Sequence, residues 1–446
     1  MEPTERQRPP RPKRARATVR TTIEIGAYAV LAVVVLGFLA VVLHGARGHS
    51  APPRSTVVVS QTEDFATTDP ALAQGQQAWE LEYATCAKLL SYPAKPGYAG
   101  TRLVPEVATS LPAISVDRLL YTFTIRRGWR FSDGNPVTAA SFARGLERAR
   151  SPRLVSPASA YLREVEGWRA QGRTLTIRLR TAAPDFAQRL ALPYFCAVPA
   201  TTPNEQTDDL PSAGPYAIAQ YTRGRSLLLH RNPYYGGSRE AHAKSILYRF
   251  GAFPSQIKLQ LERGEADYGV VSPVAFESLA SKFRGDRRHL FVVPQPTVAY
   301  LALNTQRPLF KDNPRLRRAI NYALDRPALV RLFGTHGARP GDEYLPPGFP
   351  GYQAQHVYPV GPPDLAKARR LARGHLRGGH AVFLSCGSQD CHDRAVVAAE
   401  ALRKIGLHVR VETSPGVGGF TLAGVRGTKF DIADVIARPD YGDPYG

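Results

Sequence analysis

The residues best suited to chemistry lie in one short segment near the end of the chain. CGSQDCHD, residues 386–393, holds two thiols, one imidazole and two carboxylates. These groups could ligate zinc, but a structural zinc site usually needs a second closely spaced pair of ligands, which this segment lacks. A disulfide closing the loop between Cys386 and Cys391 is the favoured alternative, and Cys86 and Cys196 then form a second disulfide. We therefore expect no metal site and no cofactor.

Known enzyme motifs are missing from the rest of the sequence. There is no Gly-x-Ser-x-Gly nucleophile elbow and no phosphate-binding Gly-x-x-x-x-Gly-Lys loop. The glycine-rich stretch at 415–424 has Thr421 where a dinucleotide fingerprint needs glycine, so a surface loop explains it better. We expect a protein that is not an enzyme, with no catalytic residues. An extracellular metal-dependent hydrolase is the remaining enzyme hypothesis.

The chain is strongly basic, with a formal net charge of +21 over 446 residues. Nucleic-acid-binding proteins usually concentrate such charge on one face, with aromatic residues interleaved. Here the basic residues are scattered along the chain, which predicts a solvated basic surface and no nucleic-acid partner. Attraction to an anionic membrane surface is a secondary interpretation.

The N-terminal region predicts a membrane anchor. Residues 1–24 form a basic tail, and the uncharged apolar run IGAYAVLAVVVLGFLAVVL follows at 25–43. About 20 apolar residues span the hydrocarbon core of a bilayer, and basic flanks stay in the cytoplasm. We therefore expect an uncleaved single-pass transmembrane helix, a linker at 44–55, and the remainder outside the cell membrane. The alternative is a cleaved signal peptide, although its apolar core is usually only about 7–15 residues long. An oxidising exterior also favours disulfides.

The remaining chain alternates strand and helix patterns, which indicates an α/β protein. Alternating apolar residues predict half-buried strands, and Asn313-Pro314 is typical of a helix start. The clearest strands are expected at 55–61, 119–125, 174–180 and 300–310, and the clearest helices at 76–92, 139–150 and 314–333. A strand, a helix and a second strand are expected in turn at 380–386, 390–406 and 407–412.

Taken in order, several segments resemble the extracellular solute-binding proteins, family 5, of ABC importers, the oligopeptide- and dipeptide-binding type. The matching stretches are the strand–turn–helix at 121–149, AGPY at 213–216, RNPYY at 231–235, the stretch at 300–326, LPPGFPG at 345–351 and PDYGDP at 439–444. One departure is Ser141, which stands where the family usually has an acidic residue, three positions after the helix-capping Thr138. We expect a weaker capping box there.

The resemblance implies a two-lobed periplasmic-binding-protein-like fold of type II, with an extra subdomain, in which a hinge closes the lobes over ligand. Lobe I is expected at 56–290, with the subdomain inserted at about 87–202, and lobe II at 291–446. The family chain continues beyond the Asp-Tyr loop, so we expect lobe II to be incomplete and ligand binding to be weak.

The resemblance also implies a function. The chain is expected to capture peptides or similar small solutes outside the membrane and to present them to ABC permease subunits and their ATPase. A membrane-tethered peptide sensor without a transport role is the alternative. Asp440 matches the family aspartate that holds a peptide's α-amino group, although it could merely cap a turn, and Asp443 could share its role. The other expected cleft residues are Tyr216, Tyr300, Asn304 and Tyr441.

Overall fold

The computed structural model describes residues 55–95, 97–271, 273–283, 289–292, 295–334, 337–386, 389–413 and 429–442. The expected tail and membrane segment at 1–43, the glycine-rich stretch at 415–424 and Asp443 lie outside these ranges. Within the described ranges, no helix combines the length and the apolar character that a membrane crossing requires.

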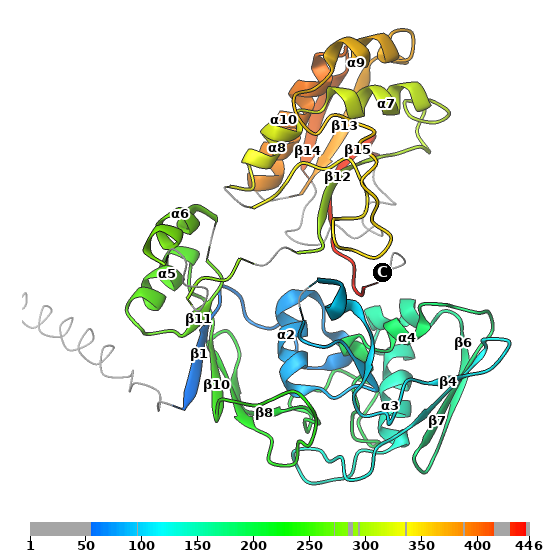
Figure 1. Cartoon of the computed structure of the whole chain (residues 1–446), viewed down its shortest axis with the longest axis vertical. Helices are drawn as coiled ribbons and strands as arrows, with labels where there is room; N and C mark the ends of the chain where they lie inside the picture. Colours follow the sequence, from blue (N-terminus) through cyan, green and yellow to red (C-terminus); the bar gives the residue numbers. More distant parts are fainter. Residues whose placement is uncertain are drawn as a thin grey trace, which may run out of the picture. The chain divides into compact units, whose positions relative to one another are not determined.

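The first sheet joins the start of the described chain to strands from its middle. Its strand order is β11-β1-β10-β9-β8, where β1 runs parallel to β10 and β11, and β10, β9 and β8 are antiparallel neighbours (Figure 1). Two helices follow β10 in the chain, and the core of this part includes Val59, Phe65 and Tyr216. The bounds are β1 Thr56–Ser60, β8 Tyr216–Thr222, β9 Ser226–Arg231, β10 Ser245–Arg249, β11 Tyr268–Gly269, α5 Pro254–Glu262 and α6 Pro273–Lys282.

The second sheet is antiparallel, with the order β4-β5-β7-β6. The expected alternation is confirmed, because Tyr121 and Phe123 of β5 are buried and their neighbours are more exposed. Helix α3 packs beside this sheet, and at its start the Ser141 hydroxyl accepts a hydrogen bond from the Thr138 N–H at 3.2 Å. Serine thus takes the place of the acidic residue in the capping box. The bounds are β4 Ala113–Ile114, β5 Leu120–Thr124, β6 Val165–Gln171, β7 Thr174–Leu179 and α3 Ala139–Arg150.

One predicted helix is shorter than expected. Helix α2 spans Gly75–Thr85, whereas the sequence pattern predicted helix to residue 92. Cys86 is extended, with φ −97° and ψ 148°, and the chain continues into the short strand β2, Leu90–Ser91, paired with β3, Val104–Pro105. Leu89 and Leu90 are buried in the core around the second sheet and not on a helix face.

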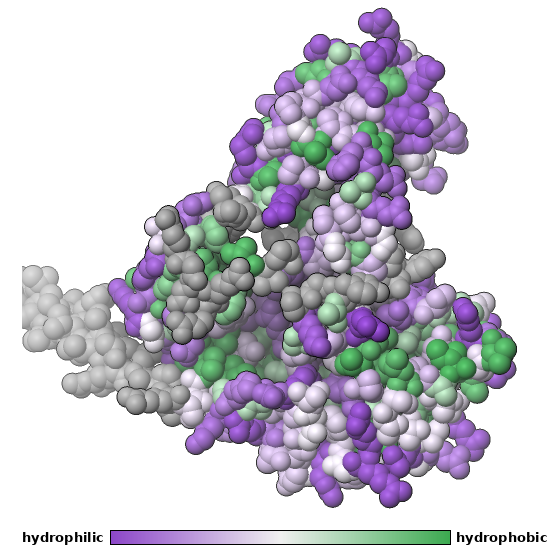
Figure 2. Space-filling model, in the orientation of Figure 1, coloured by the Kyte–Doolittle hydropathy of each residue, from purple (hydrophilic) through white to green (hydrophobic). Residues whose placement is uncertain are grey.

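The third sheet has the order β12-β15-β13-β14, and helices α7 to α10 lie beside it (Figure 1). The predicted strand–helix–strand unit is confirmed as β13, α10 and the parallel strand β14. Asn313 caps α7 and Pro314 is its first residue, as predicted. Figure 2 shows mostly hydrophilic side chains over α7 and α9. The bounds are β12 Val298–Leu303, β13 His380–Ser385, β14 His408–Thr413, β15 Ile432–Ala437, α7 Pro314–Ala323, α8 Arg326–Arg331, α9 Leu365–Ala372 and α10 Gln389–Arg403.

Both predicted disulfides are confirmed. Cys86 pairs with Cys196, and Cys386 pairs with Cys391. The first joins the end of α2 to the end of the short 3-10 helix η4, Pro193–Phe195. It links segments 110 residues apart in sequence, and closing so long a loop restricts the unfolded chain strongly.

A fully buried ion pair ties α3 to the first described segments. The Arg148 guanidinium donates to both carboxylate oxygens of Asp69, at 2.9 and 2.7 Å, and neither side chain is more than 1% exposed. Arg148 also donates to the carbonyl oxygens of Pro203 and Glu205. Asp69 accepts from the backbone N–H groups of Ala71 and Thr207. Every polar atom of the pair therefore has a partner, which is the condition for tolerating buried charge.

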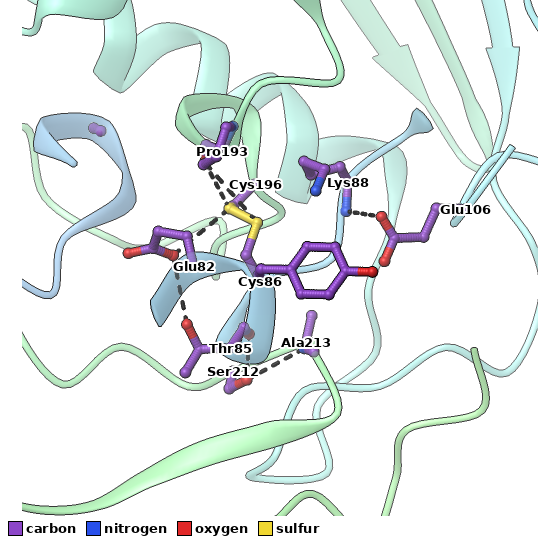
Figure 3. The surroundings of a disulfide bond; sticks show 12 residues. Glu82, Thr85, Cys86, Lys88, Glu106, Pro193, Cys196, Ser212 and Ala213 are labelled. Carbon is purple, nitrogen blue, oxygen red and sulfur yellow. Dashed lines mark hydrogen bonds between the residues drawn. A yellow bond between two sulfur atoms is a disulfide. The ribbon is translucent and has the colours of Figure 1, made fainter. Parts of the chain in front are cut away.

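Glu82 is a buried acid beside the first disulfide (Figure 3). It is 3% exposed, its Oε1 has no hydrogen-bond partner among the described residues, and a cavity of about 30 Å³ lies next to it. Burial, and secondarily the charge of Asp69, raise the pKa of Glu82 well above its ordinary value, against the opposing charge of Lys88. The carboxyl group is therefore protonated over a wider pH range in the folded chain than in the unfolded chain.

Glu82→Gln is expected to stabilise the fold increasingly as pH rises. Because the folded pKa lies above the unfolded one, the stability that neutral Glu82 provides is complete at low pH and is lost as pH increases through the folded pKa. Glutamine keeps the size and polarity and never ionises, so its advantage should reach on the order of 1 kcal/mol at pH 8. Denaturant unfolding at pH 5 and pH 8 measures this, with exposed Glu147→Gln as the control. An advantage equal at both pH values would contradict it.

Candidate functional site

Asp440 lies in the loop that follows β15, three residues after the strand ends. Its side chain is exposed, and its Oδ2 accepts a hydrogen bond from the Tyr161 hydroxyl. Its Oδ1 makes no hydrogen bond to any described residue. The Tyr161 hydroxyl therefore holds the carboxylate through one of its two oxygens.

Tyr161, which contacts this carboxylate, belongs to a group of four packed aromatic side chains from separate parts of the sequence. Tyr161 stacks on Tyr194 with ring centroids 5.9 Å apart, and it meets Tyr441 edge to face at 6.5 Å. Trp79 meets Tyr194 edge to face at 5.9 Å. We call Trp79, Tyr161, Tyr194 and Tyr441 the aromatic cluster. Trp79 comes from α2, Tyr161 from the 3-10 helix η3, Pro157–Leu162, and Tyr194 from η4.

The aromatic cluster keeps its phenols neutral beside Asp440. Burial, and then the hydrogen bond to Asp440, raise the pKa of Tyr161 far above its ordinary value. Burial and the charge of Asp440 raise the pKa of Tyr194 to about 12. Tyr161 is thus a permanent hydrogen-bond donor to the carboxylate at any physiological pH.

A charged network behind the aromatic cluster holds Tyr441 and Tyr161 in place. The Tyr441 hydroxyl donates to Oδ2 of Asp185 at 2.6 Å, and Asp185 accepts two hydrogen bonds from Arg189, at 2.9 and 3.0 Å. Arg189 also pairs with Glu164 at 2.7 Å and donates to the Tyr161 carbonyl oxygen at 3.4 Å. Burial by itself would raise the pKa of Asp185, but the hydrogen bonds from Arg189 and Tyr441 outweigh it and lower that pKa. Asp185 therefore stays ionised and acts as a fixed acceptor for Tyr441.

Two further contacts hold the loop that carries Asp440 in place. Arg438 donates to Gln76 of α2 at 2.8 Å. A Cβ atom on Gly442 would lie 2.6 Å from the Cβ of Thr101, at the end of the 3-10 helix η2, Gly97–Thr101. Since that distance is below any normal contact, a larger residue at 442 would displace the loop.

The other three residues expected in the cleft have contacts with partners other than Asp440. Tyr300, on β12, is half-buried and meets Tyr344 edge to face at 5.7 Å. Both polar groups of the Asn304 side chain bond to backbone, the amide to the Phe430 carbonyl oxygen and the oxygen to the Gln306 N–H. Tyr216 is 7% exposed in the core of the first sheet. Asp440 and Tyr441 both contact Tyr161, and a place in the cleft for Tyr216, Tyr300 and Asn304 stays a prediction.

Sequence reasoning missed Trp79, Tyr161, Tyr194 and Asp185. Tyr161 and Tyr194 lie in 3-10 helices that begin with proline, and Asp185 stands at the N-cap of the short helix α4, Phe186–Arg189. Proline and the capping aspartate give a local signal for these turns, but nothing in the sequence connects them to residue 440. The contacts of Tyr161 with Asp440 and of Asp185 with Tyr441 cross 279 and 256 residues.

Among the described residues, one group of three acidic or sulfur ligands lies close enough to bind a metal ion, namely Glu82, Cys86 and Cys196. Both sulfurs are engaged in a disulfide, so neither is available as the thiolate that metals require. This group does not fit a metal site.

Comparison with known proteins identifies the family. Residues 102–446 match the family described as bacterial extracellular solute-binding proteins, family 5 Middle. The chain belongs to this family. The family consists of solute-binding proteins and not of enzymes, and its members work on the extracytoplasmic side of the membrane.

Curated relatives agree with the assignment. The chain is 25% identical to the probable D,D-dipeptide-binding periplasmic protein DdpA of Escherichia coli (strain K12), over 89% of this chain and 77% of that protein. It is 28% identical to Protein XP55 of Streptomyces lividans, over 76% of this chain and 64% of that protein.

Solved structures show the same two-lobed fold. The clavulanic acid biosynthesis oligopeptide binding protein 2 superposes with a TM-score of 0.73 and 23% identity, over 86% of this chain and 77% of that chain. The ABC transporter-associated periplasmic binding protein DppA from Helicobacter pylori, solved in complex with the peptide STSA, gives a TM-score of 0.66 and 21% identity, over 87% of this chain and 79% of that chain. The lobe boundaries at 290 and 291 stay a prediction.

Proposed function

We propose that this chain captures peptides, or small solutes with a similar amino group, and presents them to the permease and ATPase of an ABC importer. The observation that carries the proposal is the exposed Asp440 carboxylate, held by Tyr161 against the aromatic cluster. The names of the relatives support it, because DdpA is described as dipeptide-binding and the Helicobacter pylori DppA structure contains a peptide. The proposed role is binding and not catalysis.

The chemistry of the site suits an ammonium group. A carboxylate pairs with the α-amino group of a peptide through a charge-assisted hydrogen bond, which fixes that end of the ligand and leaves its side chains free to vary. Aromatic faces add favourable contact with a cation and with the neighbouring apolar atoms. Asp440 and Tyr441 form the core of the proposed binding site, with Tyr161, Tyr194 and Trp79 added to it.

The test is a comparison of free and blocked peptides. Tripeptides such as Ala-Ala-Ala, added at concentrations high enough to detect the weak binding expected of this chain, should raise the midpoint of thermal unfolding of the 446-residue chain in a concentration-dependent manner, because a ligand that binds only the folded state stabilises it. The same peptides with an acetylated amino terminus should have little effect, since they lack the positive charge. Equal shifts for both forms, or none for free peptides from two to five residues long, would refute the proposal.

We further propose that residues 25–43 anchor the protein in the cell membrane, with residues 1–24 in the cytoplasm. The support is the uncharged apolar run and its basic flank. Amino-terminal sequencing of the membrane-fraction protein should read the sequence from residue 1 or 2. A protein that begins after residue 43 would show a cleaved signal peptide instead.

A further inference from the structure

The two disulfides of this chain differ in burial and in the groups that contact their sulfurs. Cys86 and Cys196 are 4% and 2% exposed, and Oε2 of Glu82 lies 3.9 Å from the sulfur of Cys196 (Figure 3). The hydrogen-bond partners of these sulfurs among the described residues are the Pro193 carbonyl oxygen and Glu82. Because both sulfurs are buried, a small thiol has little access to this bond, which makes it a poor target for exchange.

The second disulfide has a cation on one of its sulfurs. A guanidinium N–H of Arg394, on Nη2, points at Sγ of Cys391 with a nitrogen-to-sulfur distance of 3.1 Å. Cys391 is 8% exposed and lies in the first turn of α10, whereas Cys386 precedes the helix and is half-buried. The two sulfurs thus differ in both charge environment and access.

Arg394 is held rigidly in this position. Its Nε and Nη2 both donate to Oδ2 of Asp434 on β15, at 3.0 and 2.8 Å, and its guanidinium lies over the ring of Phe333, 5.2 Å from the centroid. Nη2 carries two hydrogens, so one can serve Asp434 while the other stays on the sulfur. The carboxylate neutralises part of the positive charge, and the remaining N–H is directed at Cys391.

The first turn of α10 contributes further charges near the disulfide. Asp390 is the acidic residue of that turn, and His392 and Asp393 follow. Gln389 donates to Asp393 at 2.7 Å, so this carboxylate has a partner within the helix. The Arg394 guanidinium places a positively charged donor on Sγ of Cys391.

We propose that Cys386–Cys391 is a thiol-exchange site for low-molecular-weight thiols. The thiolate of the small thiol attacks Sγ of Cys386, and a new sulfur–sulfur bond forms there. The Cys386–Cys391 bond breaks, and its electron pair leaves on Sγ of Cys391, where the Arg394 N–H accepts the developing negative charge. A second thiolate then attacks the mixed disulfide, which releases the Cys386 thiolate and the oxidised dimer of the small thiol. Stabilising the leaving thiolate accelerates exchange, and it also selects which sulfur is attacked.

Reduced glutathione added to the oxidised full-length chain tests this directly. Samples are quenched with N-ethylmaleimide at successive times, and each cysteine is followed by peptide mass spectrometry. We expect the Cys386–Cys391 bond to open on the order of tenfold faster than Cys86–Cys196. We also expect the first glutathione adduct on Cys386 and the first maleimide on Cys391. Equal rates for the two bonds, or glutathione mainly on Cys391, would overturn the proposal.

Variants separate the effect of Arg394 from simple access. Arg394→Met should slow opening of Cys386–Cys391 by roughly three- to tenfold, and Arg394→Lys should recover part of the loss. Arg410→Met removes an exposed charge from β14 of the same sheet and should change nothing, so an Arg394→Met rate equal to that of Arg410→Met would contradict the proposal. Should Arg394→Met fail to fold, Asp434→Asn decides: it leaves the guanidinium with more net charge, so faster opening supports the proposal, and opening at the wild-type rate or slower refutes it.

Discussion

Replacing Asp440 by asparagine is expected to weaken binding of peptides with a free amino terminus by about 2 kcal/mol, or roughly thirtyfold in Kd. Asparagine has nearly the same shape, and its amide oxygen can still accept the Tyr161 hydroxyl, so the loop should keep its position. What disappears is the negative charge that faces the ammonium group. Calorimetric titration of a tripeptide into the wild-type and Asp440→Asn chains measures the difference.

The control is the same titration with Nα-acetylated peptides, which should bind weakly to both chains and with nearly equal Kd. A second control, Glu147→Gln, removes one exposed carboxylate from α3 and should leave the Kd unchanged. If Asp440→Asn weakened free and acetylated peptides equally, Asp440 would shape the loop without contacting an amine.

Arg148→Met is expected to lower the free energy of unfolding by about 3–5 kcal/mol. Methionine has a similar length and is apolar, so the main consequence is that the Asp69 carboxylate loses its counter-ion at a site that is 0% exposed. The carbonyl oxygens of Pro203 and Glu205 also lose their donor. Urea unfolding followed by circular dichroism, with both disulfides intact, measures the loss.

Two comparisons make this result specific to the buried pair. Arg178→Met breaks an exposed ion pair with Glu166 on the second sheet, and such pairs contribute at most about 1 kcal/mol. The double variant Arg148→Met with Asp69→Leu removes both charges, and it should be more stable than Arg148→Met alone. A loss for Arg148→Met no larger than for Arg178→Met would show that the pair does not stabilise the fold.

Local sequence patterns predicted many of the strands and helix starts. Alternation at 119–125 and 174–180 predicted two strands, because side chains of a strand alternate between faces wherever the strand lies, and the structure pairs them as β5 and β7. Asn313 and Pro314 predicted the start of α7, because capping depends only on neighbouring backbone groups. The disulfide partners also followed from sequence, since four cysteines with one close pair leave few pairings.

A local pattern gave a wrong prediction at 76–92, where tertiary packing determined the backbone conformation. The apolar spacing at 76–92 suits one helix, yet α2 ends at Thr85 and Cys86 is extended where it joins Cys196. Leu89 and Leu90 then fill the core around the second sheet. A pattern of apolar residues predicts that side chains will be buried, but it does not predict which segment they will pack against.

In the candidate site, too, some residues were predicted from the sequence and others were found only in the structure. The resemblance of the Asp-Tyr loop singled out Asp440 and Tyr441 from the sequence alone. Only the tertiary structure brought Tyr161 to Asp440 and Asp185 to Tyr441, across separations of 279 and 256 residues. In the structure, Asn304 makes hydrogen bonds to the backbone and Tyr216 lies in the core.

The sequence by itself determined the strands, the helix starts, the disulfides and the loop that carries the carboxylate, since each depends on nearby residues or on a short motif. The aromatic cluster and its charged support were decided by the packing of distant segments, which no local pattern encodes.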